Sequence, residues 1–188
     1  PDTSIAAEAA RRGVTPAELA YDLMLEGDGR TILYRPTTNY ANGDLAVVHE
    51  MLDHPNTLIG LGDGGAHVGV MCDATDMAHT ISYWTRDRTR GPKHRLEDMV
   101  RRLSWNNAAA IGLSDRGRIA PGLRADINIV DYDALTLQSP KIHYDLPAGG
   151  KRLLQQATGI DATLVAGQVV WRDGEATGAL PGRLLRSG

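Results

Sequence analysis

One short segment constrains the fold more than any other: an apolar run that leads into a glycine-rich loop. Residues 57–62 read Thr-Leu-Ile-Gly-Leu-Gly, so apolar residues occur at both odd and even positions. That pattern is typical of a β-strand buried on both faces, as in a parallel sheet covered by helices. The run continues directly into Asp63-Gly64-Gly65-Ala66-His67. We therefore expect an α/β fold with a polar loop at the carboxyl end of a central strand, where such folds keep catalytic groups.

Helix signals surround this predicted strand. Thr15-Pro16-Ala17-Glu18 is a capping box with proline at the first helical position, and Gly27-Asp28-Gly29 ends the helix that it starts. Asp44 is placed to cap a second helix, which His54-Pro55 terminates. Four further elements are expected upstream of Ser114: a short strand over 31–34, a helix from about 76 to 84 with Thr75 as its cap, and helices over 96–103 and 106–111.

The pattern changes near Ser114 from helical to mainly β. Residues 125–130 alternate like a strand, and the runs 162–165 and 169–172 bracket Ala166-Gly167 as a hairpin. Pro147 to Arg152 resembles a phosphate loop but lacks its first glycine and its Ser or Thr, so we expect a turn there. The sequence thus predicts two parts, residues 1–113 and residues 114–188.

Composition excludes several classes of protein. The 188 residues carry 20 Lys and Arg against 23 Asp and Glu, a net charge of −3, so neither nucleic acid nor a membrane surface is an expected partner. Cys72 is the only cysteine, which rules out an internal disulfide and favours a cytoplasmic location. The first residues lack the pattern of a signal peptide, and we expect the chain to be a piece of a longer polypeptide.

Gly60-Leu61-Gly62-Asp63-Gly64-Gly65 also matches the dinucleotide-binding pattern G-x-G-x-x-G. An acid inside the loop would repel a pyrophosphate, and no clear helix start follows Gly65. A ribose-binding acid on a second strand is missing as well. A nicotinamide or flavin oxidoreductase therefore stays an alternative, testable by cofactor titration.

Asp63 is the main candidate for chemistry. A carboxylate at the end of a buried strand, in a loop too rich in glycine to shield it, suits a catalytic group, although it could simply cap the next element. His67 lies four residues further along the same loop and is a second candidate. Asp73, Asp76 and His79 look like metal ligands, but their spacing does not place them on one helix face, so we interpret them as a solvated turn.

Four segments in order resemble the carboxyl-terminal part of the amidohydrolase superfamily, and most closely the N-acyl-D-amino-acid deacylases (D-aminoacylases). They are 62–67 (Gly-Asp-Gly-Gly-Ala-His), 106–113 (Asn-Asn-Ala-Ala-Ala-Ile-Gly-Leu), 116–126 (Arg-Gly-Arg-Ile-Ala-Pro-Gly-Leu-Arg-Ala-Asp), and 162–167 with 174–183. The resemblance implies the last βα units of a metal-dependent (β/α)8 barrel, followed by strands of a small β-sandwich.

The same resemblance implies a role for Asp63. It matches the acid after the eighth barrel strand, which contacts zinc, takes a proton from the bound water and delivers it to the leaving nitrogen. The family's histidine ligands are absent here, and one carboxylate cannot hold a catalytic zinc, so most ligands are expected upstream of Pro1. The expected partners are a small N-acyl amino acid substrate and the missing amino-terminal half.

Two alternatives remain open at this point. A cyclic-amide hydrolase, such as a hydantoinase or dihydroorotase, would share the metal and the aspartate. A non-catalytic packing or assembly fragment would suit the β-rich part after Ser114. We expect the chain as given to be inactive alone, whichever enzyme it comes from.

Overall fold

The computed structural model describes residues 2–36, 38–40, 42–60, 62, 65, 67–70 and 73–185. The chain divides into two compact units, the first ending at Met51 and the second beginning at Leu52. In the part that is described, no helix is long and apolar enough to cross a membrane. The predicted division at residue 113 is a different boundary and stays a prediction.

The first unit begins with two short helices, α1 (Ile5–Arg12) and α2 (Pro16–Gly29), which pack together and bury Ala9 and Leu19. The predicted capping box at the start of α2 is confirmed. The Glu18 N–H donates to Thr15 Oγ1 (3.2 Å), and the Thr15 N–H donates to Glu18 Oε2 (2.8 Å). Each side chain thus satisfies a backbone donor at the helix start.

The end of α2 is also as predicted, because its last residues lose helical geometry. Gly27 and Asp28 adopt left-handed φ angles of 59° and 58°. The strand expected over 31–34 is wrong, since these residues are coil and Tyr34 is 87% exposed. A strand needs a neighbour for its backbone N–H and C=O groups, and within the described residues none pairs with this segment.

Helix α3 (Ala46–Asp53) begins after Asp44, whose carboxylate accepts a hydrogen bond from the Ala46 N–H (2.9 Å). This side-chain cap is the one that the sequence predicts. The helix ends at Asp53, directly before His54-Pro55, as expected.

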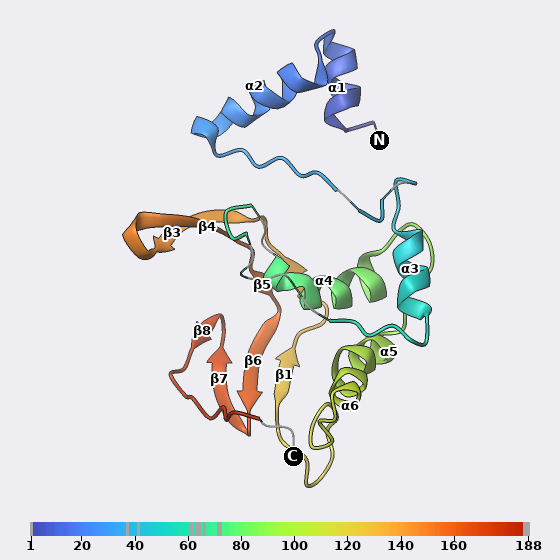
Figure 1. The fold of residues 1–188 in the computed structure, drawn as a ribbon, viewed down its shortest axis with the longest axis vertical. Helices are drawn as coiled ribbons and strands as arrows, with labels where there is room; N and C mark the ends of the chain where they lie inside the picture. The colour runs from blue at the N-terminus through green and yellow to red at the C-terminus, as the bar shows by residue number, and fades with distance from the viewer. Residues whose placement is uncertain are drawn as a thin grey trace. The chain divides into compact units, whose positions relative to one another are not determined.

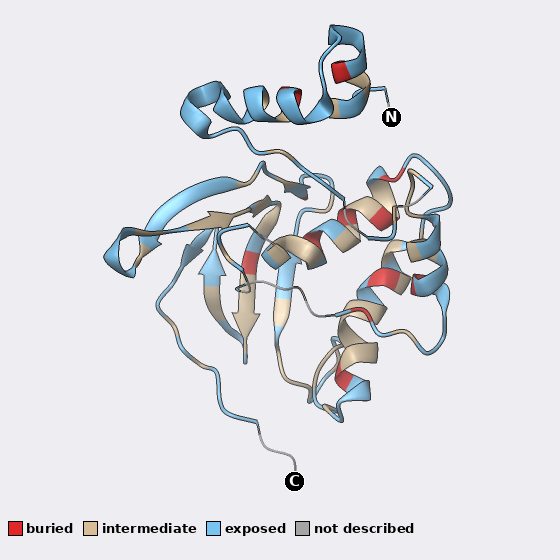
Figure 2. Ribbon diagram, turned by 45° about the horizontal axis from the view of Figure 1, so that its top comes forward, coloured by how far each residue is buried: buried red, intermediate tan, exposed pale blue. Residues whose placement is uncertain are grey.

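The second unit contains two longer helical segments, each including a π-helical turn. A 3-10 turn η1 (Asp73–Thr75) leads into α4 (Asp76–Ser82), which continues as the π turn η2 (Tyr83–Asp87). Helix α5 (Leu96–Arg101) continues through the π turn η3 (Arg102–Asn106) into α6 (Asn107–Ala110). Trp84 and Met99 are buried and anchor the two segments in the core. Buried positions occur along the helices of this unit (Figure 2).

The predicted central strand is not formed over residues 57–60, which are coil. Ile59 is buried, but its carbonyl accepts a hydrogen bond from the Asn107 side-chain amide (2.5 Å) instead of from a strand. Up to residue 113 the described ranges hold helices and coil without any strand, so the strands of the predicted α/β alternation are not seen in those ranges. The apolar pattern identified a buried segment, but a parallel strand also requires neighbouring strands.

The predicted β-rich region after Ser114 is confirmed. An antiparallel sheet has the order β1-β6-β7-β8 and is built from β1 (Ile127–Val130), β6 (Ile160–Val165), β7 (Gln168–Arg172) and β8 (Glu175–Ala176). Ala166 and Gly167 turn β6 into β7 with φ angles of 49° and 78°, so the expected hairpin is present. Helices α5 and α6 lie beside β1, at the end of the sheet opposite β8 (Figure 1).

Two small antiparallel ribbons complete the second unit. Strand β2 (Thr136–Leu137) pairs with β5 (Ala157–Thr158), and β3 (Lys141–Leu146) pairs with β4 (Gly150–Leu154). The 3-10 turn η4 (Pro147–Gly149) joins β3 to β4, so the turn predicted from Pro147 to Arg152 is confirmed over 147–149, while 150–152 lie on β4. Asp145 and Arg152 form a two-pronged ion pair across this hairpin (2.8 and 2.6 Å).

Candidate functional site: the loop from Gly62 to Val70

The loop from Gly62 to Val70 carries both candidate catalytic residues. Asp63 lies outside the described residues, so its role stays a prediction. His67 is described: it is exposed and has a left-handed φ of 47°. A turn holds it there, in which the Val70 N–H donates to the His67 carbonyl (2.9 Å). This conformation is uncommon for a residue with a side chain and costs about 1–2 kcal/mol, so neighbouring contacts must maintain it.

The loop begins in close contact with the start of α4. A Cβ atom added at Gly62 would lie 2.8 Å from the Asp73 carbonyl oxygen and 3.4 Å from Asp76 Oδ2. Glycine is therefore required here to let the backbone approach the helix. Asp73 and Asp76 are half-buried while His79 is exposed, so the interpretation of these residues as a solvated turn is wrong for the two aspartates in that respect.

On its other side the loop is joined to the β-rich region. The Leu153 N–H, on β4, donates a hydrogen bond to the Val68 carbonyl (2.6 Å). Nearby, Thr75 Oγ1 donates to Gln155 Oε1 (2.6 Å), a contact between residues 80 positions apart. The sequence predicts that the Thr75 side chain caps α4, but it makes no capping hydrogen bond. It links η1 to the segment after β4 instead. The sequence did not indicate Leu153 or Gln155 as site residues, because no local pattern marks a contact between residues so far apart in the chain.

His79, on α4, is the next histidine along the chain after His67. Its ring stacks on Tyr83, with ring centroids 5.1 Å apart, and the residue as a whole is exposed. Partial burial lowers the pKa of His79, and the nearby Asp87 carboxylate offsets part of that change. A neutral imidazole at neutral pH can accept a proton or bind a metal.

Metal-ligand side chains around this loop do not converge among the described residues. His67, Asp73, Asp76 and His79 do not place any three ligand atoms within reach of one ion. A catalytic zinc usually takes three protein ligands. The part of the loop that is described therefore does not fit a complete zinc site by itself.

Elsewhere in the second unit, Asp53 lies between two basic groups. Its Oδ1 atom is 3.4 Å from His94 Nδ1 and 3.9 Å from Arg102 Nη2. The His94 side chain is only 7% exposed. This group links the end of α3 to the helices that follow, and we assign it no chemistry.

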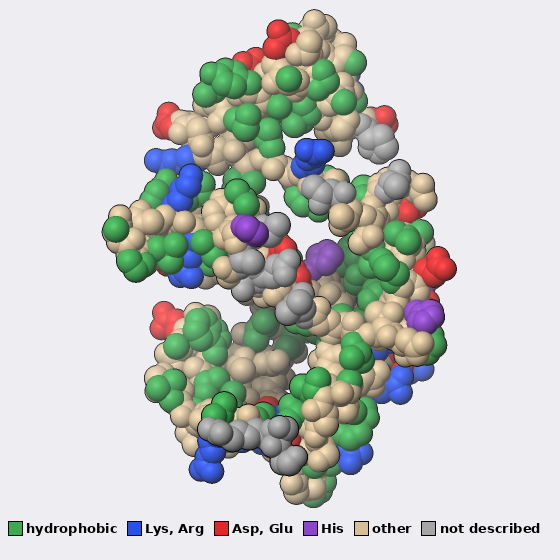
Figure 3. All heavy atoms as spheres, in the orientation of Figure 1, with side chains coloured by type: hydrophobic (Ala, Val, Ile, Leu, Met, Phe, Trp, Pro, Cys, Tyr) green, Lys and Arg blue, Asp and Glu red, His purple; other side chains and the backbone are tan. Residues whose placement is uncertain are grey.

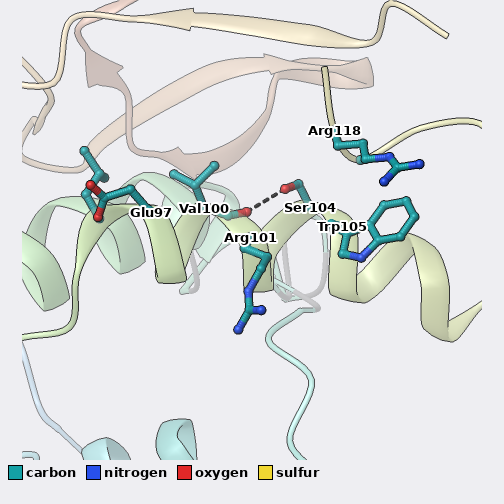
Figure 4. A pocket seen from close by; sticks show the side chains of 8 residues that line it. Glu97, Val100, Arg101, Ser104, Trp105 and Arg118 are labelled. Carbon is teal, nitrogen blue, oxygen red and sulfur yellow. Dashed lines mark hydrogen bonds between the residues drawn. The ribbon is translucent and has the colours of Figure 1, made fainter. Parts of the chain in front are cut away.

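A largely apolar groove runs between α5 and the β region (Figure 4). Arg118 lies over the ring of Trp105, 4.5 Å from its centroid, and Ser104 donates to the Val100 carbonyl (2.6 Å). The groove continues toward α4 and β1, where Met77, Ile81 and Ile127 line it. Figure 3 shows this part of the surface hollowed between the sheet and the helices, with hydrophobic side chains in the recess.

Comparison with known proteins identifies the family. The amidohydrolase family (Amidohydro_3) matches residues 4–171, so the chain belongs to the amidohydrolase family. A 5-methylthioadenosine/S-adenosylhomocysteine deaminase of Nitratidesulfovibrio vulgaris (strain DSM 19637 / Miyazaki F) is 29% identical over 165 residues, 82% of this chain and 34% of the deaminase. An N-acyl-D-aspartate deacylase of Alcaligenes xylosoxydans xylosoxydans is 27% identical over 186 residues, 96% of this chain and 30% of the deacylase.

Within that family the chain is D-aminoacylase-like. A D-aminoacylase variant in complex with CuCl2 has a similar fold, with a TM-score of 0.55 and 23% identity over 97% of this chain and 34% of that structure. The resemblance predicted from the four sequence segments is therefore confirmed. The chain spans about a third of the length of these relatives.

Proposed function

We propose that this chain is the carboxyl-terminal part of a metal-dependent hydrolase that cleaves the amide bond of N-acyl-D-amino acids. The products would be a carboxylate and a D-amino acid. The observation that carries the proposal is the family match over residues 4–171, which includes the loop held between α4 and β4. The N-acyl-D-aspartate deacylase and the D-aminoacylase structure support this substrate class over a cyclic amide.

The proposed fold is the end of a (β/α)8 barrel, residues 1–113, followed by strands of a small β-sandwich, residues 114–188. Support comes from the antiparallel sheet β1-β6-β7-β8, which is the kind of sheet that one layer of a sandwich requires. The loop from Gly62 to Val70 would then follow the last barrel strand, at the face where barrel enzymes place their catalytic groups. Residues 57–60, which are coil here, would form that last barrel strand only beside the neighbouring barrel strands.

Asp63 is proposed as the general base and acid. Its carboxylate would take a proton from the attacking water as the water oxygen bonds to the amide carbon. It would return that proton to the leaving nitrogen as the C–N bond breaks. His67, exposed on the same loop, is proposed to contact the substrate or the reacting water.

Zinc is the metal that we propose for the whole enzyme, with Asp63 as its only ligand from this chain. The described side chains around the loop do not fit a complete site, so we derive no step through the ion. The remaining ligands are proposed to come from an amino-terminal half. The structure of D-aminoacylase with CuCl2 supports a metal in a relative, without specifying zinc.

The test is an assay of residues 1–188 joined to the amino-terminal two thirds of the deacylase relative. We expect hydrolysis of N-acetyl-D-aspartate with little activity on the L-enantiomer. Asp63→Asn should abolish most of it without changing the circular dichroism spectrum. Unchanged turnover in Asp63→Asn would favour the alternative of a packing or assembly part, and turnover of dihydroorotate or a hydantoin would favour a cyclic-amide hydrolase.

A further inference from the structure

We propose that Gln155, together with the backbone of Leu153, is a positioning element for the candidate catalytic loop. It would fix the conformation in which the loop presents His67. The catalytic role of the loop in this inference rests on the proposed function, whereas the contacts that hold the loop do not. It assigns the β-rich part of the chain a role in the site, beyond support of the barrel.

The first observation is the backbone contact between Leu153 and Val68. The Leu153 N–H donates to the Val68 carbonyl at 2.6 Å, one residue after His67. Because His67 holds a left-handed φ of 47°, its backbone would relax without an external restraint. Strand β4 supplies that restraint from the carboxyl side of His67.

The second observation is the side-chain network around Gln155. Its Oε1 accepts from Thr75 Oγ1 (2.6 Å), and its Nε2 donates to the Gln138 carbonyl (2.9 Å). The contact to Thr75 is partly buried, so water replaces it poorly. Gln155 thereby fixes the distance between η1 and the coil segment that follows β4.

These two contacts act on the same loop from different directions. Gly62 leaves no room for a side chain against the Asp73 carbonyl, so η1 determines where the loop begins. Thr75, at the end of η1, is attached to Gln155, and Leu153 is two residues before Gln155 on the chain. The segment Leu153 to Gln155 therefore holds η1 and Val68 in fixed positions relative to each other. A substitution at Gln155 should for that reason alter the conformation of His67.

The experiment uses NMR on the chain itself. The ring signal of His67 is assigned with His67→Gln, and hydrogen exchange is followed at the Leu153 amide. Thr75→Val and Gln155→Leu should each shift the His67 ring signal and speed exchange at Leu153 by roughly five- to tenfold, the effect of losing one hydrogen bond. Thr75→Ser retains the hydroxyl donor to Gln155 Oε1 and should keep both readouts like those of the wild type.

Thr177→Val is the control, because it removes a hydroxyl donor of similar length, to the Val169 carbonyl (2.7 Å), at a residue that follows β8 and lies away from the loop. It should change neither readout. Wild-type-like His67 and Leu153 signals in folded Thr75→Val and Gln155→Leu would overturn the inference, as would an unprotected Leu153 amide in the wild-type chain. If the signals move but Asp63→Asn does not reduce hydrolysis, the proposed function fails and the positioning contact stands.

Discussion

The guanidinium of Arg86 donates a hydrogen bond to the backbone carbonyl of Leu135 at 2.6 Å. The same group donates to the carbonyls of Tyr132 and Asp133, and Leu135 is almost completely buried. One planar side chain therefore satisfies three carbonyls in the connection between β1 and β2. This is how the π turn after α4 is joined to the β-rich region.

Replacing Arg86 with Lys should destabilise the second unit and lower its urea midpoint, because a single ammonium cannot reproduce the fork geometry that three carbonyls require. Urea unfolding followed by Trp fluorescence would measure the change. Arg95→Lys is the control, since the Arg95 side chain is 76% exposed and pairs only loosely with Glu97 (3.6 Å). Equal stability of the two variants would show that the carbonyl contacts contribute nothing.

The sequence predicts local features of this chain well and distant contacts poorly. The capping box at Thr15 and the turn at Ala166-Gly167 depend on residues within four positions, so the pattern alone determines them. Thr75 shows the limit: its spacing predicts a helix cap, but its hydroxyl donates to Gln155, which the local sequence cannot indicate. Residues 57–60 show the same limit for a strand, whose formation depends on neighbours rather than on its own apolar pattern.

Part of the candidate site could be predicted in the same way. The glycine-rich loop and its family resemblance led to the amidohydrolase family, which the match over residues 4–171 confirms. The contact of Gly62 with Asp73 and the left-handed φ of His67 depend on packing between segments, so no sequence rule identifies them. Asp63 lies outside the described residues, and its assignment stays a prediction.

Gly62→Ala should disturb the candidate loop, because the new Cβ would lie 2.8 Å from the Asp73 carbonyl oxygen. The loop or η1 must then move, and we expect a loss of stability of about 1–3 kcal/mol together with altered loop amide signals. Gly69→Ala is the control in the same loop, since no atom lies within 4 Å of its added Cβ. Indistinguishable melting curves and NMR spectra for the two variants would contradict the close approach.

Gly159 and Gly174 offer a matched pair, since both have a φ of +86°. A Cβ at Gly159 would lie 2.6 Å from the Leu135 nitrogen, whereas nothing lies within 4 Å of one at Gly174. Gly174→Ala should cost about 1 kcal/mol from backbone strain alone, and Gly159→Ala should cost at least about 2 kcal/mol more from the clash. Thermal unfolding of both variants measures the difference, and similar melting temperatures would show that Leu135 can move aside.

Asp126 should make the stability of the β-rich region depend on pH. Partial burial acts to raise the pKa of Asp126, but the Ala166 N–H and the Arg124 and Arg116 guanidinium groups outweigh it and lower the pKa. Since the folded-state pKa lies below the unfolded value of about 3.9, the contribution is complete above that value and is lost as pH falls through the folded pKa. Asp126→Asn should therefore cost about 1–2 kcal/mol at pH 7 and progressively less below about pH 4.

Urea unfolding of wild type and Asp126→Asn at several pH values from 7 to 3 would check the sign. A stability difference that stays constant, or grows toward acid, would contradict the assigned pKa direction. Asp161→Asn is a useful reference in the same sheet, because it tests whether any lost carboxylate gives the same profile.

Residues 1–188 alone should bind little zinc, because a catalytic site needs three ligands and the described side chains around the loop do not bring three together. Elemental analysis of the purified chain after dialysis should give well below one zinc per chain, and Asp63→Asn should not change the value. About one zinc per chain that is lost in Asp63→Asn would instead mean that this loop completes a site with its own residues or with a second copy. Retention of the ion in that variant would assign it to other ligands and leave the amidohydrolase proposal unaffected.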